Sequence, residues 1–260
     1  MLKLCASMNF LFTELPPGDR PAAAAAAGFD GIEFQDFSIE EPAVLAEAAG
    51  AAGVRIVLIN VPLGDLLDGG AGLSGVPGRQ RDFADALAAT HEAALILKPA
   101  FINVGAFRAG AAGTQASLPL YLENIDKAAA MFRDIGAVPL IEPMNGHDIP
   151  GIFPENLDLA CRLVREHCPR GAGLLLDTYH AARRGDDAAK AFASHRDVIR
   201  HIQISDFPAR NEPGTGAIDF PEFFSVLRDA GYSGFVSAEY RPSASSEQSL
   251  DWMQQAVPAR

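Results

Sequence analysis

Residues 138–143 read VPLIEP, an apolar run that ends at the carboxylate Glu142. A short apolar run closed by one polar side chain recurs in GLLLDTYH, IRHIQISD and GFVSAEY, where the closing residues are Asp177, Gln203 and Glu239. Each run has the length and composition of a buried β-strand, and helical segments separate the runs. The pattern predicts parallel strands whose carboxyl ends carry four polar side chains.

The rest of the chain continues this alternation of short apolar strands with helices, which is typical of a parallel sheet. Helical character is expected in the intervening segments, among them Pro21–Ala27, Pro42–Ala52, Phe83–Leu95, Leu118–Ile135 and Pro154–Glu166. Eight strands are predicted, at Leu2–Met8, Gly31–Phe34, Val54–Ile59, Phe101–Val104, Val138–Glu142, Leu174–Asp177, Ile199–Ser205 and Phe235–Glu239.

The length of 260 residues fits a (β/α)8 barrel, which takes about 250 residues. A doubly wound open sheet would use the same elements, but its G-x-G-x-x-G dinucleotide fingerprint is missing after the first strand. We therefore predict an α/β protein, a (β/α)8 TIM barrel, with residues 1–260 forming one domain.

The net charge of the chain limits the kinds of partner that the protein can bind. With 21 basic and 33 acidic side chains, the net charge is −12, which argues against a nucleic-acid binder relying on contacts with phosphate. No apolar run approaches the roughly 20 residues that span a bilayer. A small-molecule substrate is expected, and the apolar helices leave room for a homodimer interface.

The cysteines and the N-terminal segment indicate a compartment. Cys161 and Cys168 are expected to share a helix, where seven residues correspond to roughly 10 Å, too far for a disulfide. Together with Cys5 they make an odd count, and no signal-peptide cleavage pattern follows the first residues. A soluble, reduced, cytoplasmic protein is expected.

Strand register allows the four polar residues to meet. Placing Gln203 inside the barrel also turns His201 inward, whereas Ile202 and Ile204 face the helices. A structural alternative exists for each carboxylate; Asp177, for example, can cap the helix that follows it. Three like charges at one barrel mouth would nevertheless cost stability unless a cation offset them, so a shared site is favoured.

Oxygen ligands without cysteine favour Mg²⁺ or Mn²⁺, with Glu142, Asp177, Gln203 and Glu239 as the candidate ligands. Zinc would become more plausible if His180 or His201 joined them. The expected role of His180 is to donate to a substrate oxygen, whereas His201 is expected to be a hydrogen-bonded residue of the barrel interior. Glu33 lies at the end of the second strand. It is equally expected to line the pocket or to cap a helix.

Two loops are candidates for contacts with the substrate. The glycine-rich segment Leu63–Pro77 is long for this architecture, in which such loops usually cover the active site. After the seventh strand, Arg210 is expected to grip a substrate carboxylate, and the backbone N–H groups of Pro213–Gly216 (PGTG) offer a weaker anion-binding alternative.

At these motifs the sequence resembles the hydroxypyruvate isomerase family within the xylose-isomerase-like barrels. The likeness covers essentially the whole chain and is carried by GFDGIEF, LIEPMNGHDIPGIF, LLLDTYHAARRGD, HIQISDFPARNEPGTGAIDF and GYSGFVSAEYRP. The resemblance implies that Glu142 and Glu239 form an acid/base pair and that the metal lies among Glu142, Asp177, Gln203 and Glu239. Related ketose 3-epimerases carry histidine where Gln203 stands.

The activity implied is a metal-assisted isomerisation of hydroxypyruvate to tartronate semialdehyde through an enediolate, with Arg210 or loop N–H groups holding the substrate carboxylate. Alternatives on the same barrel are a 2-oxo-tetronate isomerase and a sugar or sugar-acid epimerase or dehydratase. An endonuclease acting at abasic sites would need several histidine ligands and a basic groove, and a pure binding protein would not need paired glutamates.

Overall fold

The barrel strands are short and almost entirely buried. In the computed structural model, which describes residues 1–109, 113–168 and 171–257, they are β1 (Lys3–Ser7), β2 (Gly31–Phe34), β3 (Arg55–Asn60), β4 (Phe101–Asn103), β6 (Val138–Ile141), β8 (Gly173–Asp177), β9 (Ile199–Ile204) and β10 (Phe235–Ala238). Within the described residues these eight strands pair in parallel in the order given, and β10 closes on β1. The predicted (β/α)8 barrel is confirmed.

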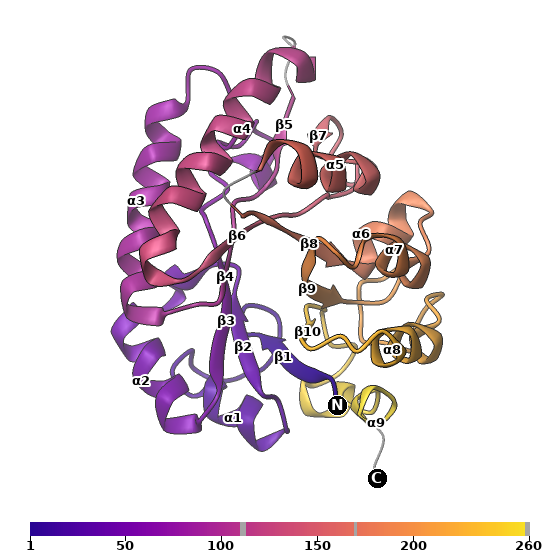
Figure 1. The fold of residues 1–260 in the computed structure, drawn as a ribbon. Coiled ribbons are helices and arrows are strands. Elements are labelled where there is room, and N and C mark those ends of the chain that lie inside the picture. The colour runs from indigo at the N-terminus through magenta and orange to yellow at the C-terminus, as the bar shows by residue number, and fades with distance from the viewer. Residues whose placement is uncertain (110–112, 169–170, 258–260) are drawn as a thin grey trace.

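Helices surround the strands (Figure 1). Their described bounds are α1 (Arg20–Ala26), α2 (Pro42–Ala52), α3 (Gln80–Leu97), α4 (Gly113–Phe132), α5 (Leu157–His167), α6 (Thr178–Arg184), α7 (Ala188–His195), α8 (Phe220–Asp229) and α9 (Met253–Ala256). The five predicted helical segments are confirmed, Pro42–Ala52 with identical bounds and the other four with shifted ends. Gly53 shows why α2 stops where it does, since its φ of +72° is the left-handed conformation that glycine adopts at a helix end.

A two-stranded antiparallel sheet, β5 (Phe107–Arg108) with β7 (Ile152–Phe153), was not predicted. Two residues per strand are too few to show a periodic pattern. The helix α5 begins at Leu157 instead of the predicted Pro154, because Asn156 caps it by accepting from the N–H of Leu159. Figure 1 shows this small sheet at the end of the barrel opposite to the N-terminus.

The loop Leu63–Pro77 packs against the segments that follow β4 and β6. Leu66, in the 3₁₀ turn Leu66–Asp68, forms a small apolar cluster with Ala106, Met144 and Ile152. Residues after β4 and β6 lie beyond the carboxyl ends of those strands, so the loop rests on the mouth side of the barrel. This is the face on which such barrels carry their active sites.

The barrel interior is filled in layers, and the predicted strand register is confirmed. Ile202, Ile204, Val236 and Ala238 belong to the large core between strands and helices. Separate clusters fill the inside of the barrel below its mouth: one contains Cys5, Val57 and Phe235, and the other Leu58, Leu140 and Leu175. Polar side chains inside the barrel lie above these two clusters, nearer the mouth.

The remaining expectations concern the cysteines and membranes. Cys5, Cys161 and Cys168 are buried free thiols, and Cys168 lies just past the end of α5. Trp252 is a core residue, stacked on Phe224. Within the described part of the chain, no helix is long and apolar enough to cross a membrane.

Candidate active site

Two carboxylates and an imidazole converge at the carboxyl ends of β6 and β8. His180 Nε2 lies 3.7 Å from Glu142 Oε1 and 3.8 Å from Asp177 Oδ2. One potential ligand atom from each of the three residues lies within 4.8 Å of the others, so the group has the dimensions of a metal site. Side-chain exposure is only 12% for Glu142, 0% for Asp177 and 3% for His180, so water screens these groups poorly.

Asp177 has both of the roles that the sequence left open. Its Oδ1 caps α6 by accepting from the backbone N–H groups of Tyr179, at 2.7 Å, and His180, at 3.3 Å. Its Oδ2 points the other way, toward the guanidinium of Arg210 at 3.2 Å. The cap fixes the rotamer and thereby aims the second oxygen into the site.

Glu239 follows β10 and joins the group through Arg210. Arg210 Nη2 donates to Glu239 Oε2 at 2.7 Å, and the same nitrogen contacts Asp177. Burial raises the pKa of Glu239 well above its usual range, and the carboxylates Asp177 and Glu142 add to the effect against the opposing pull of Arg210. Burial also opposes the charge on Arg210, but Glu239, Asp177 and Glu142 outweigh it and hold the pKa of the guanidinium above its ordinary value.

Arg210 is held over the site by its neighbours. Its guanidinium carbon lies 5.1 Å from the ring centre of Tyr179 and 5.7 Å from that of Phe10, both suitable for cation–π attraction. Its φ of +58° is unusual for a residue with a side chain, so the surrounding loop must impose it. The expectation that Arg210 lies at the mouth is confirmed; its contact with substrate remains a proposal.

The Pro213–Gly216 loop does not offer its amides to a ligand. The buried carboxylate of Asp206 accepts from the N–H groups of Gly214 at 2.9 Å and Gly216 at 2.8 Å. Its other oxygen accepts from Phe207 and Ile218. The idea of an anion held by these glycine amides is therefore wrong, because an internal anion already occupies the loop.

Asp206 should thus determine the conformation of the loop that carries Arg210. We expect Asp206→Ala to lower the free energy of unfolding by roughly 2 kcal/mol, the usual cost of losing hydrogen bonds to a charged group, as measured by urea denaturation. Asp219→Ala, which removes a single helix-capping bond at Glu222, is the matched control and should cost about 1 kcal/mol. An Asp206→Ala protein as stable as the control would contradict this role.

Glu33 lines the interior beneath the site and does not cap a helix. Its Oε2 accepts from His201 Nε2 at 2.7 Å, which confirms His201 as a hydrogen-bonded residue of the barrel interior. Its Oε1 accepts from Gln203 Nε2 at 2.8 Å and from Gln35. Glu33 therefore fixes the amide orientation of Gln203.

Gln203 is the register partner of Asp177 on the adjacent strand, so both side chains face the same side of the sheet. With its nitrogen bound to Glu33, the amide oxygen of Gln203 is buried and has no hydrogen-bond partner among the described residues. A buried acceptor without a partner costs free energy, which a cation or a donor group would recover.

Asn103, at the end of β4, orients Glu142 and was not identified from the sequence. Its amide nitrogen donates to Glu142 Oε2 at 2.7 Å, and its oxygen accepts from the backbone of Gly105. Burial, followed by the charge of Asp177, raises the pKa of Glu142 to about 7 although the bond from Asn103 opposes the shift. A carboxyl group of this kind exchanges protons readily near neutral pH.

The donors at this mouth fit a divalent cation. Glu142, Asp177 and Glu239 supply carboxylate oxygens, and Gln203 supplies an amide oxygen that lacks a partner. In the described structure one guanidinium, that of Arg210, contacts two of the three carboxylates. Oxygen donors in excess of positive charge are the surroundings that hard cations prefer.

The raised pKa of Glu142 predicts how stability depends on pH. Between its ordinary value of 4.5 and about 7, the folded protein retains a proton on Glu142 that the unfolded chain releases. This contribution to stability is complete below pH 4.5 and disappears as the pH rises through 7; Glu239 acts in the same direction. Without added metal, the melting temperature should therefore fall across this range.

A divalent cation would offset the same charges, so Mg²⁺ should raise the melting temperature more at pH 8 than at pH 5.5. Thermal unfolding with Mg²⁺ or with EDTA at both pH values measures the difference. Glu142→Gln, which does not titrate, should reduce the pH dependence. Equal Mg²⁺-induced shifts at the two pH values would contradict the expectation.

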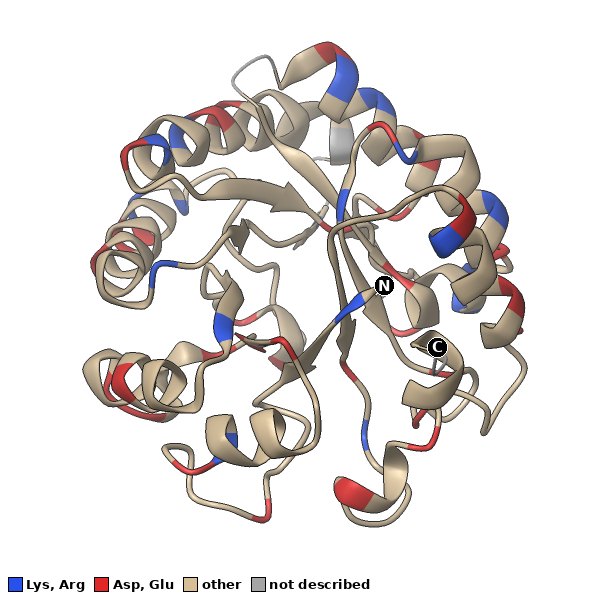
Figure 2. Cartoon of the chain, turned by 60° about the horizontal axis from the view of Figure 1, so that its bottom comes forward, with Lys and Arg blue, Asp and Glu red and all other residues tan. Residues whose placement is uncertain are grey.

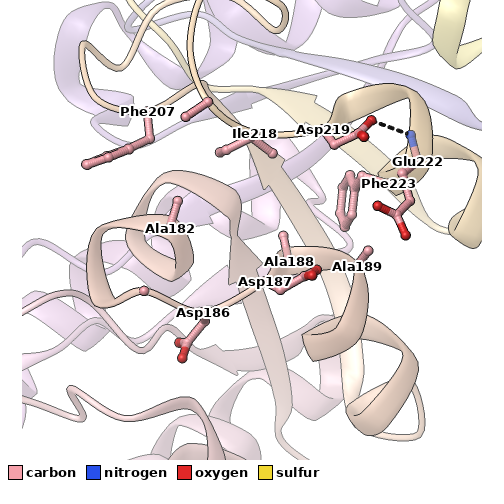
Figure 3. A pocket seen from close by; sticks show the side chains of 12 residues that line it. Ala182, Asp186, Asp187, Ala188, Ala189, Phe207, Ile218, Asp219, Glu222 and Phe223 are labelled. Atoms are coloured by element: carbon pink, nitrogen blue, oxygen red, sulfur yellow. Dashed lines mark hydrogen bonds between the residues drawn. The ribbon is translucent and has the colours of Figure 1, made fainter.

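A hollow of about 340 Å³ lies outside the barrel between α6, α7 and α8 (Figure 3). Three of the four acidic side chains that line it already have structural partners. Asp187 caps α7, Asp219 caps α8 and Asp186 pairs with Arg184. It offers no cluster comparable to the one at the mouth.

Comparison with known proteins agrees with this geometry. The family described as xylose isomerase-like TIM barrel matches residues 21–256. Hydroxypyruvate isomerase of Escherichia coli K12 is 34% identical, and 2-oxo-tetronate isomerase of Cupriavidus necator is 33% identical; each alignment covers 97% of this chain and 98% of the relative. A crystal structure described as AP endonuclease, family 2, from Brucella melitensis superposes with a TM-score of 0.91 at 30% identity, over 97% of this chain and 98% of the other.

The chain belongs to the xylose isomerase-like TIM barrel family, and these two relatives, matched over nearly their full length, support isomerase activity. The residues predicted from the sequence as catalytic, metal-binding or substrate-binding all lie at the carboxyl ends of the strands or in the segments just beyond them: Glu142, Asp177, His180, Gln203, Arg210 and Glu239.

Proposed function

We propose that the protein is a metal-assisted isomerase that converts hydroxypyruvate to tartronate semialdehyde through an enediolate. The observation that carries the proposal is the pair of buried glutamates, Glu142 and Glu239, both with raised pKa values and both in contact with the same polar cluster. Moving a proton between neighbouring carbons requires one group to remove it and one to return it.

In this scheme one glutamate of the pair removes a proton from C3 of hydroxypyruvate, and the other delivers a proton to C2. The proton of the C3 hydroxyl is transferred to the oxygen on C2, so that C3 becomes the aldehyde and C2 the carbinol. Arg210 holds the substrate carboxylate. To do so, its guanidinium gives up part of its hydrogen bonding to Glu239 and donates to the substrate instead. His180 donates from Nε2 to a substrate oxygen as charge develops there. Burial lowers the pKa of His180 to about 4, so the imidazole is neutral at physiological pH.

Glu142, Asp177, Gln203 and Glu239 would hold the cation, and their oxygen donors favour Mg²⁺ or Mn²⁺. When bound, the cation would stabilise negative charge on the substrate oxygens. The unpartnered amide oxygen of Gln203 supports this assignment independently of the carboxylates.

A 2-oxo-tetronate isomerase is the second candidate, supported by the relative from Cupriavidus necator. It would use the same glutamates on a substrate one carbon longer. Epimerase or dehydratase chemistry on the same barrel would need the same residues but give other products.

Cleavage of DNA is disfavoured by charge. Figure 2 shows lysine and arginine scattered among acidic residues over the outer helices, and no continuous basic band of the described chain is visible from this side. The net charge of −12 would repel a phosphate backbone. The six histidines of the chain also include His201, which is bonded to Glu33 within the barrel.

The substrate can be identified by comparing kcat/KM for hydroxypyruvate, a 2-oxo-tetronate and a ketose, each with Mg²⁺ or Mn²⁺. We expect hydroxypyruvate to give the highest value. A clear preference for the 2-oxo-tetronate would retain the acid/base assignment and replace the substrate. Inversion of the ketose without isomerisation of either acid would overturn the proposal.

A further inference from the structure

His180 has one ring nitrogen in the site and the other in contact with Asn145. Its Nε2 lies between Glu142 and Asp177 and has no hydrogen-bond partner among the described residues. Its Nδ1 lies 2.7 Å from the amide nitrogen of Asn145. Whether Nε2 carries a proton or a lone pair therefore depends on which role Asn145 imposes on Nδ1.

The amide orientation of Asn145 is fixed by two contacts that do not involve His180. Its Oδ1 accepts from the backbone N–H of Asp148 at 2.8 Å, and its Nδ2 donates to the Asp148 carboxylate at 3.0 Å. A flipped amide would place an oxygen against the carboxylate and an NH₂ group against the backbone N–H, and would lose both bonds. The group facing His180 is therefore the NH₂ donor.

Asp148 is itself held in place from the far side. Tyr179 donates its hydroxyl to Asp148 Oδ2 at 2.8 Å, and Arg183 Nε donates to Oδ1 at 3.1 Å. The ring of Tyr179 also faces the guanidinium of Arg210. The carboxylate of Asp148 therefore holds both Asn145, which contacts His180, and Tyr179, which contacts Arg210. This network leaves the Asn145 side chain, which is completely buried, little freedom to turn.

We propose that Asn145 is a positioning residue that holds neutral His180 in the tautomer with an unprotonated Nδ1 and a protonated Nε2. His180 then directs an N–H into the site and acts as a hydrogen-bond donor to a substrate oxygen. It does not act as a third metal ligand with Glu142 and Asp177, because a metal ligand needs a lone pair on that nitrogen. The effect on catalysis rests on the proposed isomerase function. The assignment of the tautomer rests only on the hydrogen bonds of Asn145.

The tautomer can be read directly by NMR. In protein labelled with ¹⁵N-histidine, long-range ¹H–¹⁵N correlations distinguish protonated from unprotonated ring nitrogens, and the signals missing in His180→Gln identify the residue. We expect protonated Nε2 and unprotonated Nδ1, both before and after addition of Mg²⁺. Protonated Nδ1, or loss of the Nε2 proton when Mg²⁺ binds, would overturn the proposal.

Asn145→Asp tests the consequence, because a carboxylate at this position accepts a hydrogen bond and favours the opposite tautomer. We expect the proton to move to Nδ1 and kcat to fall by about 10²- to 10⁴-fold, with KM changing much less. Asn156→Asp, the same substitution at the cap of α5, is the matched control and should leave the His180 spectrum and kcat unchanged.

The two possible failures can be told apart. The wild-type spectrum needs neither substrate nor variant, so a wrong substrate assignment or an unfolded variant leaves the tautomer test intact. If the expected tautomer is found but Asn145→Asp switches it without loss of turnover on the identified substrate, the positioning role is overturned while the isomerase function stands.

Discussion

Glu239→Gln should lower kcat by about 10²- to 10⁴-fold, the contribution expected from a general acid or base, while the protein stays folded. Glutamine has the same shape and still accepts a hydrogen bond from Arg210, but it cannot exchange a proton at neutral pH. Because Glu239 is buried beside other carboxylates, removal of its charge should not destabilise the fold. Steady-state kinetics with thermal unfolding on the same sample measure both effects.

Glu247→Gln provides the control, since it makes the same chemical change at an exposed position in the segment after β10. It should leave kcat and melting temperature unchanged. Near-normal turnover in Glu239→Gln, with the control also active, would remove Glu239 from the acid/base pair and overturn the proposed chemistry.

Asp177→Asn should separate metal binding from folding. Asparagine caps helices as well as aspartate does, so the bonds from Oδ1 to the start of α6 survive. The ion pair with Arg210 is lost, but so is the repulsion between Asp177 and the carboxylates of Glu142 and Glu239, and stability should change by less than about 1 kcal/mol. The other oxygen becomes an NH₂ group, which cannot bind a cation and faces the guanidinium of Arg210. We expect at least about 100-fold weaker binding of Mn²⁺, with turnover lost in proportion.

Asp187→Asn is the matched control, because Asp187 caps α7 with the same kind of bond, to the N–H of Lys190, and lies outside the barrel mouth. It should preserve both stability and Mn²⁺ affinity. Titration of each variant with Mn²⁺ by calorimetry or by the EPR signal of free Mn²⁺ gives the affinities. Unchanged affinity in Asp177→Asn would remove Asp177 from the metal site.

The barrel could be predicted from the sequence because each strand is a short apolar run that ends in a turn or a polar residue. In Ile199–Ile204, alternation alone places Gln203 and His201 inside and Ile202 outside, and the structure agrees. The pair β5 and β7 escaped prediction because two-residue strands have no period and depend on packing between distant loops.

The site was only partly predictable, for a physical reason. Residues such as Asp177 and Glu239 stand out because a charge at the end of a buried strand is unusual. Asn103 and Asn145 act by orienting neighbours across 39 and 35 positions of sequence, and an asparagine at a strand end or in a loop is too common to signal such a role. The glycines at 214 and 216 suggested an anion site, but the anion proved to be the side chain of Asp206.

The most direct test of the central claim is incubation of the Mg²⁺- or Mn²⁺-loaded protein with hydroxypyruvate in D₂O, with the C3 protons followed by NMR. A sample treated with chelator serves as the control. Proton abstraction at C3 and return of a proton to C2 predict metal-dependent loss of the C3 signal together with the appearance of tartronate semialdehyde carrying deuterium at C2. If the C3 protons persist and no product forms in the metal-loaded sample, the account of this protein as a hydroxypyruvate isomerase is contradicted.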